Sequence, residues 1–209
     1  MTLLFIILYA ATLIYFALSE RVRMFVVLLS IQGALLFGVV FFSLYKIELF
    51  DFIFILIETI MVKSIIIPWF LNKVRKHNNL KRVHEPFVPV FYSIIVAVIS
   101  LLFSFLVSNY LKENQIHTVY FTVAFASVIF GLYFIIIHKN LFSHLVGYLI
   151  IENGIFLFSL TVGSVMPLMV NLAILLDVFM GVLVLGTFVN RIGNTFDSIE
   201  IDQLSKLKD

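Results

Sequence analysis

The segment LFSHLVGYLIIENGIFLFSLTVG, residues 141–163, decides the fold class. It is long and apolar enough to cross the hydrocarbon core of a bilayer, which takes about 20 residues of helix. Its single acidic residue, Glu152, lies at its centre, far from both ends. The segment therefore predicts a membrane-spanning helix that carries an ionisable group at mid-depth.

The rest of the chain has the same apolar character. Hydrophobic residues make up 62% and charged residues 12% of the 209 residues, against roughly 45–50% and 25% in a soluble domain. Six further apolar runs predict spans at residues 2–18, 24–44, 52–71, 87–111, 118–137 and 167–189. We therefore expect an all-α polytopic membrane protein of about seven helices, without room for a separate soluble domain.

The composition excludes several kinds of chemistry. Because the chain has no cysteine, it has no disulfide, thiolate zinc site, iron–sulfur cluster or cysteine nucleophile. Its five histidines show no paired metal-ligand spacing, and no glycine-rich phosphate loop is present. We therefore expect this chain to bind no cofactor or metal. A net charge of +2 in short loops also gives no reason to expect a nucleic-acid partner.

Lysine and arginine are divided unequally between the predicted loops. If the N-terminus is outside, all loop Lys and Arg except Lys46 and Lys112 lie on the cytoplasmic side, and the longest connection, residues 72–85, is the most basic. The positive-inside rule then predicts an outside N-terminus and a cytoplasmic C-terminus.

The first three and last three spans resemble each other. Glu58 and Asp177 lie near the middle of the third and seventh spans, and a Gln-Gly pair at 32–33 matches an Asn-Gly pair at 153–154. Because four spans separate equivalent positions, both units point the same way across the membrane, as parallel repeats do. We predict three-helix units at 1–72 and 112–190, a basic loop and joining helix at 73–111, and a cytoplasmic tail at 191–209.

Four ionisable residues lie inside predicted spans: Glu58, Lys63, Glu152 and Asp177. Each costs about 2.5–3.5 kcal/mol at the centre of a membrane helix. Glu58 and Lys63 are five residues apart, about 140° around an α-helix, so we expect Lys63 to pair across helices. One lysine neutralises one of three carboxylates, and protonation is the least costly state for the other two.

Two interpretations of these buried charges remain. One is a structural ion pair that holds helices together; the other, which we favour, is proton or cation translocation, because ionisable residues at this depth commonly mark ion pathways. His144 and Tyr148 precede Glu152 at two successive intervals of four residues. The three therefore share one stripe of the helix and predict a relay toward its cytoplasmic end. Pro68, just past Lys63, is expected to free a backbone carbonyl and kink the helix.

A family resemblance rests on LVGYLIIENG at 145–154, on Asp177, and on IEIDQLSKLK at 199–208. With Lys63 and Pro68, these stretches resemble the hydrogenase-4 component E family. The second half is also similar to the K-type subunit of complex I and to the small subunit of Mrp-type cation/proton antiporters. In this resemblance Asp177 takes the place of the second membrane glutamate of the complex I subunit. The first would fall at Leu149, three residues before Glu152.

The resemblance implies a membrane-arm subunit of a group 4 membrane-bound hydrogenase or formate hydrogenlyase-like complex, in the cytoplasmic membrane of a bacterium or archaeon. Antiporter-like and quinone-subunit-like membrane proteins and peripheral hydrogenase subunits would be its partners, and they would hold the nickel–iron site and iron–sulfur clusters. Its implied role is to pass H⁺ or Na⁺ through Glu152, Asp177, Lys63 and Glu58 when redox chemistry elsewhere changes their proton affinities. Two alternatives remain open, an antiporter subunit without a redox partner and a structural scaffold.

Overall fold

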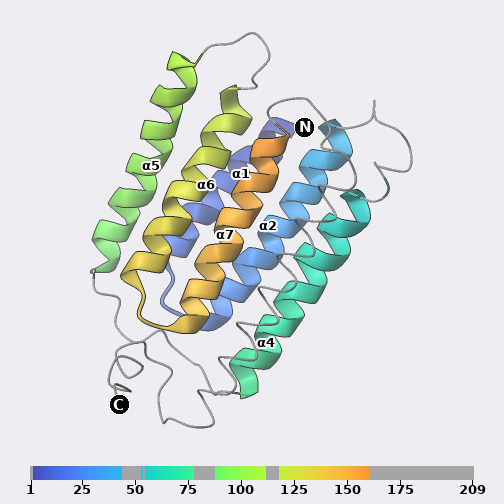
Figure 1. Ribbon diagram of the computed structural model, residues 1–209, viewed down its shortest axis with the longest axis vertical. Coiled ribbons are helices and arrows are strands. Elements are labelled where there is room, and N and C mark those ends of the chain that lie inside the picture. The colour runs from blue at the N-terminus through green and yellow to red at the C-terminus, as the bar shows by residue number, and fades with distance from the viewer. Residues whose placement is uncertain (1, 44–52, 54, 78–87, 112–117, 161–209) are drawn as a thin grey trace, which may run out of the picture.

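The computed structural model describes residues 2–43, 53, 55–77, 88–111 and 118–160. Every regular element among these residues is a helix, and the helices lie side by side with nearly parallel axes (Figure 1). The green helix α5 lies at one edge of the bundle and the teal helix α4 at the other. The prediction of an all-α polytopic membrane protein is confirmed.

The elements are α1 Thr2–Leu18, α2 Val22–Ser43, the π-helix η1 Glu58–Ile66, α4 Ile67–His77, α5 Val90–Tyr110, α6 Thr118–Ile137 and α7 Leu141–Ser159. Five helices in this part of the chain are long and apolar enough to cross a membrane, with η1 and α4 forming one of them, and α1 is a shorter apolar helix of 17 residues. Six of the seven predicted spans are therefore helical. The seventh, residues 167–189, lies outside the described residues.

The third span continues beyond its predicted end. The sequence places the end of this helix at residue 71, where the apolar run stops, but α4 extends to His77. Arg75 donates two hydrogen bonds to Oδ1 of Asn72, of 3.1 Å from Nε and 2.8 Å from one terminal nitrogen. A helix that leaves the membrane can continue in water when its polar side chains support it. The predicted loop at 72–85 therefore begins as helix.

Glycine lets α6 and α7 pack closely. A Cβ added to Gly131 would lie 3.0 Å from the carbonyl oxygen of Gly147, and one added to Gly147 would lie 3.1 Å from that of Gly131. Gly154 meets α6 in the same way, because its Cβ would lie 2.7 Å from Cβ of Ser127. Small residues are the usual means by which membrane helices bring their backbones together. This contact fixes α7, and hence Glu152, against α6.

The outer helix α5 has two different faces. Its small residues, among them Ser93, Ala97 and Ser100, are buried. Large apolar side chains such as Phe91 and Leu106 are about two-thirds exposed on the other side, at 67% and 66%. Lipid chains solvate such a face, whereas small residues suit contact with neighbouring helices. This division fits a helix at the edge of a membrane bundle.

Candidate functional site

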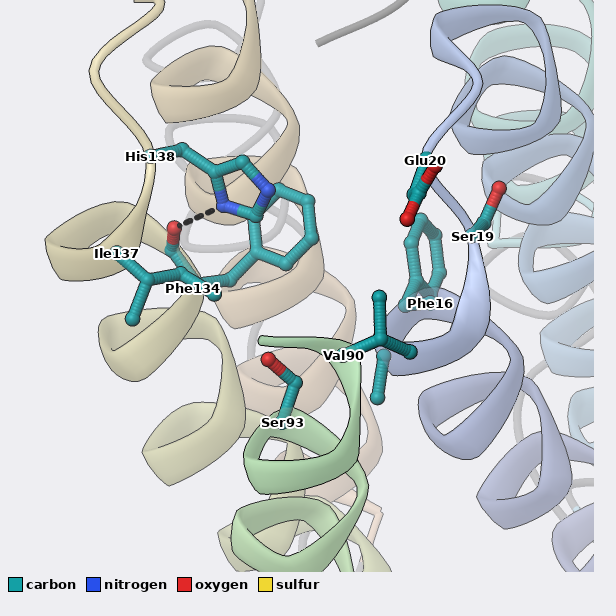
Figure 2. A pocket seen from close by; sticks show the side chains of 9 residues that line it. Phe16, Ser19, Glu20, Val90, Ser93, Phe134, Ile137 and His138 are labelled. Carbon is teal, nitrogen blue, oxygen red and sulfur yellow. Dashed lines mark hydrogen bonds between the residues drawn. The ribbon is translucent and has the colours of Figure 1, made fainter. Parts of the chain in front are cut away.

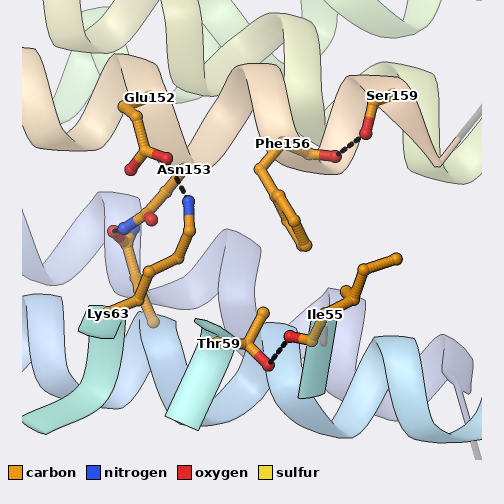
Figure 3. Close-up of polar contacts among 8 residues, drawn as sticks. Ile55, Thr59, Lys63, Glu152, Asn153, Phe156 and Ser159 are labelled. Atoms are coloured by element: carbon orange, nitrogen blue, oxygen red, sulfur yellow. Dashed lines mark hydrogen bonds and ion pairs between the residues drawn. The ribbon is translucent and has the colours of Figure 1, made fainter. Parts of the chain in front are cut away.

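An ion pair joins two helices inside the bundle. Lys63 of η1 donates from Nζ to Oε1 of Glu152 on α7, and only 5% and 7% of these two residues is exposed (Figure 3). Both residues lie well inside helices of membrane-spanning length. The prediction that Lys63 pairs across helices is confirmed, and its partner is Glu152.

The Lys63 ammonium has a second partner on the same helix. Phe156 follows Glu152 by one turn of α7, and Lys63 Nζ lies 4.5 Å from the centroid of its ring. A desolvated cation over an aromatic face gains about 2 kcal/mol. The ammonium is therefore held between a carboxylate and a ring, and only the carboxylate can take up a proton.

The helix that carries Lys63 is irregular at this point. Residues 58–66 form a π-helix, and Pro68 is the second residue after its end. Since Pro68 has no N–H to donate, it frees the carbonyl of Ser64 one turn earlier, as the sequence predicts. Ser30 Oγ of α2 donates a hydrogen bond of 2.7 Å to that carbonyl. A π-helical segment inside an α-helix is frequently found at a functional site.

The π-helix changes the register of the predicted charges. The expected angle of about 140° between Glu58 and Lys63 assumes α-helical geometry. In a π-helix the backbone hydrogen bonds run from residue i to i+5, so the backbones of these two residues lie one turn apart, on the same side. The α-helical expectation for this pair is therefore wrong. The side chain of Glu58 lies outside what the structure describes.

Helix α2 holds the backbone of Lys63 in place. A Cβ added to Gly33 would lie 2.8 Å from the carbonyl carbon of Lys63 and 2.8 Å from the nitrogen of Ser64. Ser64 Oγ also donates to the carbonyl of Ser30, at 3.1 Å. Together with the bond from Ser30 to Ser64, this makes a reciprocal pair of hydrogen bonds between the two helices. Backbone atoms cannot move away by changing rotamer as a side chain can, so only glycine fits at position 33 without a shift of the helices.

We expect Gly33→Ala to lower the free energy of unfolding by about 1–3 kcal/mol, because overpacking against backbone forces the helices apart. Gly38→Ala on the same helix is the matched control. The atoms nearest to its Cβ would belong to the ring of Phe5, 2.7 Å away, and a side chain can move where a backbone cannot. Thermal unfolding in detergent compares the two variants. Equal melting temperatures would show that α2 does not clamp η1.

A chain of amides and hydroxyls runs beside the ion pair. Asn153 Nδ2 donates to Oε1 of Gln32 at 3.3 Å, and Gln32 Nε2 donates to Oγ1 of Thr12 at 2.9 Å. All three residues are buried, and they link α7, α2 and α1. The sequence singled out Gln32 and Asn153 as equivalent positions of a repeat but did not predict that they touch. Thr12 was missed altogether.

The remaining predicted relay residues are only partly placed. His144 and Tyr148 lie on α7 before Glu152, and both are half-buried. Asp177 lies outside the described residues, and only the backbone of Glu58 is described. Of the six predicted residues, the structure brings Lys63 and Glu152 into direct contact. Among the described residues, no group of three or more His, Cys, Asp or Glu side chains is arranged to hold a metal.

A small pocket lies where α1 and α6 end and α5 begins (Figure 2). Its volume is about 20 Å³, which is enough for a water molecule. Glu20, Ser93 and His138 are among the residues that line it. His138 Nδ1 lies 2.8 Å from the carbonyl oxygen of Phe134.

Burial lowers the pKa of His138 from 6.5 to about 4, against the opposing effect of the hydrogen bond with Phe134, and nearby His144 lowers it further. As the pH falls, His138 therefore binds a proton near pH 6.5 in the unfolded chain but only near pH 4 in the folded protein. The free energy of unfolding is unaffected above pH 6.5. It falls by about 3 kcal/mol as the pH drops from 6.5 to 4.

We expect His138→Gln to flatten this dependence, because glutamine does not titrate. Melting temperatures between pH 7 and pH 4 test the expectation, since the other titrating groups are common to both proteins. Parallel curves for the variant and the wild type would contradict it.

One protein-family model matches the second part of the chain. Residues 119–209 match the family described as NADH-ubiquinone/plastoquinone oxidoreductase chain 4L, the K-type subunit of complex I. This part of the chain includes α6 and α7 and therefore Glu152. The Uncharacterized protein Rv0085 of Mycobacterium tuberculosis is 25% identical over 156 residues, which cover 73% of this chain and 71% of that protein. No solved structure matches. The family match supports a membrane subunit of a complex I-like assembly.

Proposed function

We propose that this chain is a membrane-arm subunit of a group 4 membrane-bound hydrogenase or formate hydrogenlyase-like complex, and that Lys63 and Glu152 form its proton-carrying site. The match of residues 119–209 to the complex I chain supports the general class. The hydrogenase assignment rests on the sequence resemblance at 145–154, at Asp177 and at 199–208.

The observation that carries the proposal is a buried ion pair between two membrane helices. When Glu152 is ionised, the pair neutralises itself at a depth where lone charges are costly. When Glu152 takes up a proton, Lys63 keeps a favourable contact with the ring of Phe156, 4.5 Å away. The site therefore has two states that differ by one proton, and each state leaves the ammonium with a partner.

Movement of the ammonium couples this site to events elsewhere. A nearby cation favours the ionised carboxylate, so withdrawing Lys63 favours proton uptake and its return favours release. The π-helix around Lys63 and the clamp at Gly33 and Ser30 are the local elements that set its position. Redox chemistry in partner subunits, which would hold the nickel–iron site and iron–sulfur clusters, supplies the driving force in this scheme.

Further members of the relay remain proposals. Asp177 and Glu58 are the other acids within predicted spans, and His144 and Tyr148 precede Glu152 on the same helix. With the N-terminus outside, His144 lies toward the cytoplasmic end of α7. In this scheme a proton enters along the α7 stripe to Glu152 and continues to the acid of the seventh span.

Co-purification tests which assembly contains the chain. A tagged chain, expressed at native level and purified in mild detergent, is expected to bring with it a nickel- and iron-containing hydrogenase together with large membrane subunits. Large antiporter subunits without metal would instead favour an Mrp-type cation/proton antiporter. An assembly in which transport is insensitive to Glu152 would leave the chain a scaffold, and the proposed function would be wrong.

A further inference from the structure

The outward side of the third span, which η1 and α4 form, changes character along its length. Met61, Ile65 and Trp69 follow one another at intervals of four residues and are 50%, 55% and 64% exposed. Lys73 continues the series and is also exposed, and Lys76 is exposed about one turn further on. The exposed side of this helix therefore passes from apolar side chains to an aromatic ring and then to two ammonium groups.

This order matches the change of surroundings from the middle of a bilayer to its surface. Lys63, on the buried side of the same helix, lies near the middle of the predicted span 52–71. Lys73 is ten residues further along, about 15 Å of helix, which is half the thickness of the hydrocarbon core. Its Nζ lies 5.6 Å from the centroid of the Trp69 ring, and tryptophan is enriched at the membrane interface. The two exposed ammonium groups therefore lie at the level of the lipid headgroups.

The protein supplies these ammonium groups with no counter-charge. Within the part of the chain that the structure describes, neither Lys73 nor Lys76 forms an ion pair. The sequence has no acidic residue from position 59 to position 84. Arg75 adds a third positive charge, and its two hydrogen bonds to Asn72 hold it on α4. A positive cluster that continues an exposed apolar stripe complements a ligand with an anionic head and apolar tails.

Membrane topology alone does not require this arrangement. The positive-inside rule depends on how many lysines and arginines a loop contains, and an irregular loop satisfies it. Here the first three basic residues belong to a helix that continues to His77, and Lys73 is aligned with the exposed apolar side chains. A cluster of four to eight basic residues directly beside a membrane helix is typical of anionic-lipid binding, and residues 73–82 contain five.

We propose that the exposed side of η1 and α4 binds an anionic phospholipid. Its phosphate oxygens accept hydrogen bonds from Lys73 and Lys76, its glycerol region lies against Trp69, and an acyl chain follows the apolar residues of the same stripe. A zwitterionic phospholipid binds less strongly, because its own cationic group is repelled by the lysines. This site is separate from the proposed proton-carrying pair, and it places a lipid on the helix that carries Lys63.

Tryptophan fluorescence tests this inference, because Trp69 is the single tryptophan of the chain. The purified chain is reconstituted in phosphatidylcholine vesicles that contain increasing shares of brominated phosphatidylglycerol or, separately, of brominated phosphatidylcholine. Bromine quenches tryptophan on contact, so the quenching curves give the relative affinity of the two lipids beside Trp69. We expect phosphatidylglycerol to bind about tenfold more strongly, since each lysine at the surface favours an anionic lipid by about fivefold.

Two single substitutions separate a site from general surface charge. Lys76→Gln is expected to lower the preference for phosphatidylglycerol by about fivefold, while Lys73 stays beside the ring. Lys139→Gln is the matched control and leaves the preference unchanged. It removes an equal charge from the connection between α6 and α7, which lies at the same end of the bundle as the end of α4 (Figure 1).

Three results would overturn the inference. The first is equal quenching by the two brominated lipids in the wild type, and the second is an equal effect of Lys76→Gln and Lys139→Gln. The third is a Trp69 that neither lipid quenches, because protein, such as a second copy of the chain, would then cover this side of the helix. Each of these results leaves the proposed role of Lys63 and Glu152 untouched.

Discussion

Lys63→Met is expected to lower the free energy of unfolding by about 3–5 kcal/mol, the usual effect of removing one partner of a buried ion pair. The loss does not come from packing, because methionine is also long, flexible and apolar. Most of it comes from Glu152, which remains at 7% exposure without its cation and must either stay charged or bind a proton. The rest comes from the lost contact of the ammonium with the ring of Phe156. Thermal or chaotrope unfolding in detergent measures the effect.

The double variant Lys63→Met/Glu152→Leu is expected to recover most of this stability. Replacing both members of a buried pair with apolar residues is often neutral or even stabilising. The double variant should therefore be more stable than Lys63→Met alone, and the two substitutions should be strongly non-additive.

Lys73→Met serves as the control. Lys73 is an exposed lysine on α4, 5.6 Å from the ring centroid of Trp69, so its replacement should cost less than about 1 kcal/mol. If Lys63→Met lowered the free energy of unfolding no more than Lys73→Met does, the buried ion pair would not stabilise the fold. Additive effects in the double variant would also contradict direct contact between Lys63 and Glu152.

The fold class was predictable because length and hydropathy alone determine it. Apolar runs of about 20 residues admit few structures in a bilayer other than helices. The six spans that the structure describes lie close to their predicted ranges. Helix α4 extends to His77 instead of ending at 71, because hydropathy marks where a helix leaves the membrane and not where it ends.

The candidate site was predictable only in part. The sequence shows that Lys63 and Glu152 are charges inside membrane spans. The expectation that Glu58 and Lys63 lie on different faces assumed an α-helix, and the π-helix at residues 58–66 contradicts it. The sequence does not determine which acid, among Glu152, Asp177 and the others, pairs with Lys63. That depends on the register between helices, which is set by close contacts such as that of Gly33 with the backbone of Lys63.

Some residues of the candidate site were less evident from the sequence. Gln32 and Asn153 are polar residues in apolar helices and stand out in the sequence, whereas Thr12, to which Gln32 donates, does not. Pro68 signalled an irregular helix, but a proline does not show whether the result is a kink or a π-helix.

The second large effect concerns transport. Glu152→Gln keeps the size and hydrogen-bonding capacity of the side chain but cannot exchange a proton. In the proposed mechanism this variant assembles into its complex and abolishes coupled proton movement. Asp177→Asn is expected to do the same if the seventh span completes the relay. Glu20→Gln is the control, because Glu20 lies in the connection between α1 and α2. Gln32→Glu would not serve as a control, because it adds a charge.

Proton translocation by the intact complex, reconstituted in liposomes and divided by its catalytic turnover, tests the proposed role of Lys63 and Glu152 most directly. We predict that Glu152→Gln retains assembly and loses translocation, while Glu20→Gln retains both. A Glu152→Gln complex that moves as many protons per turnover as the wild type would contradict the proposal.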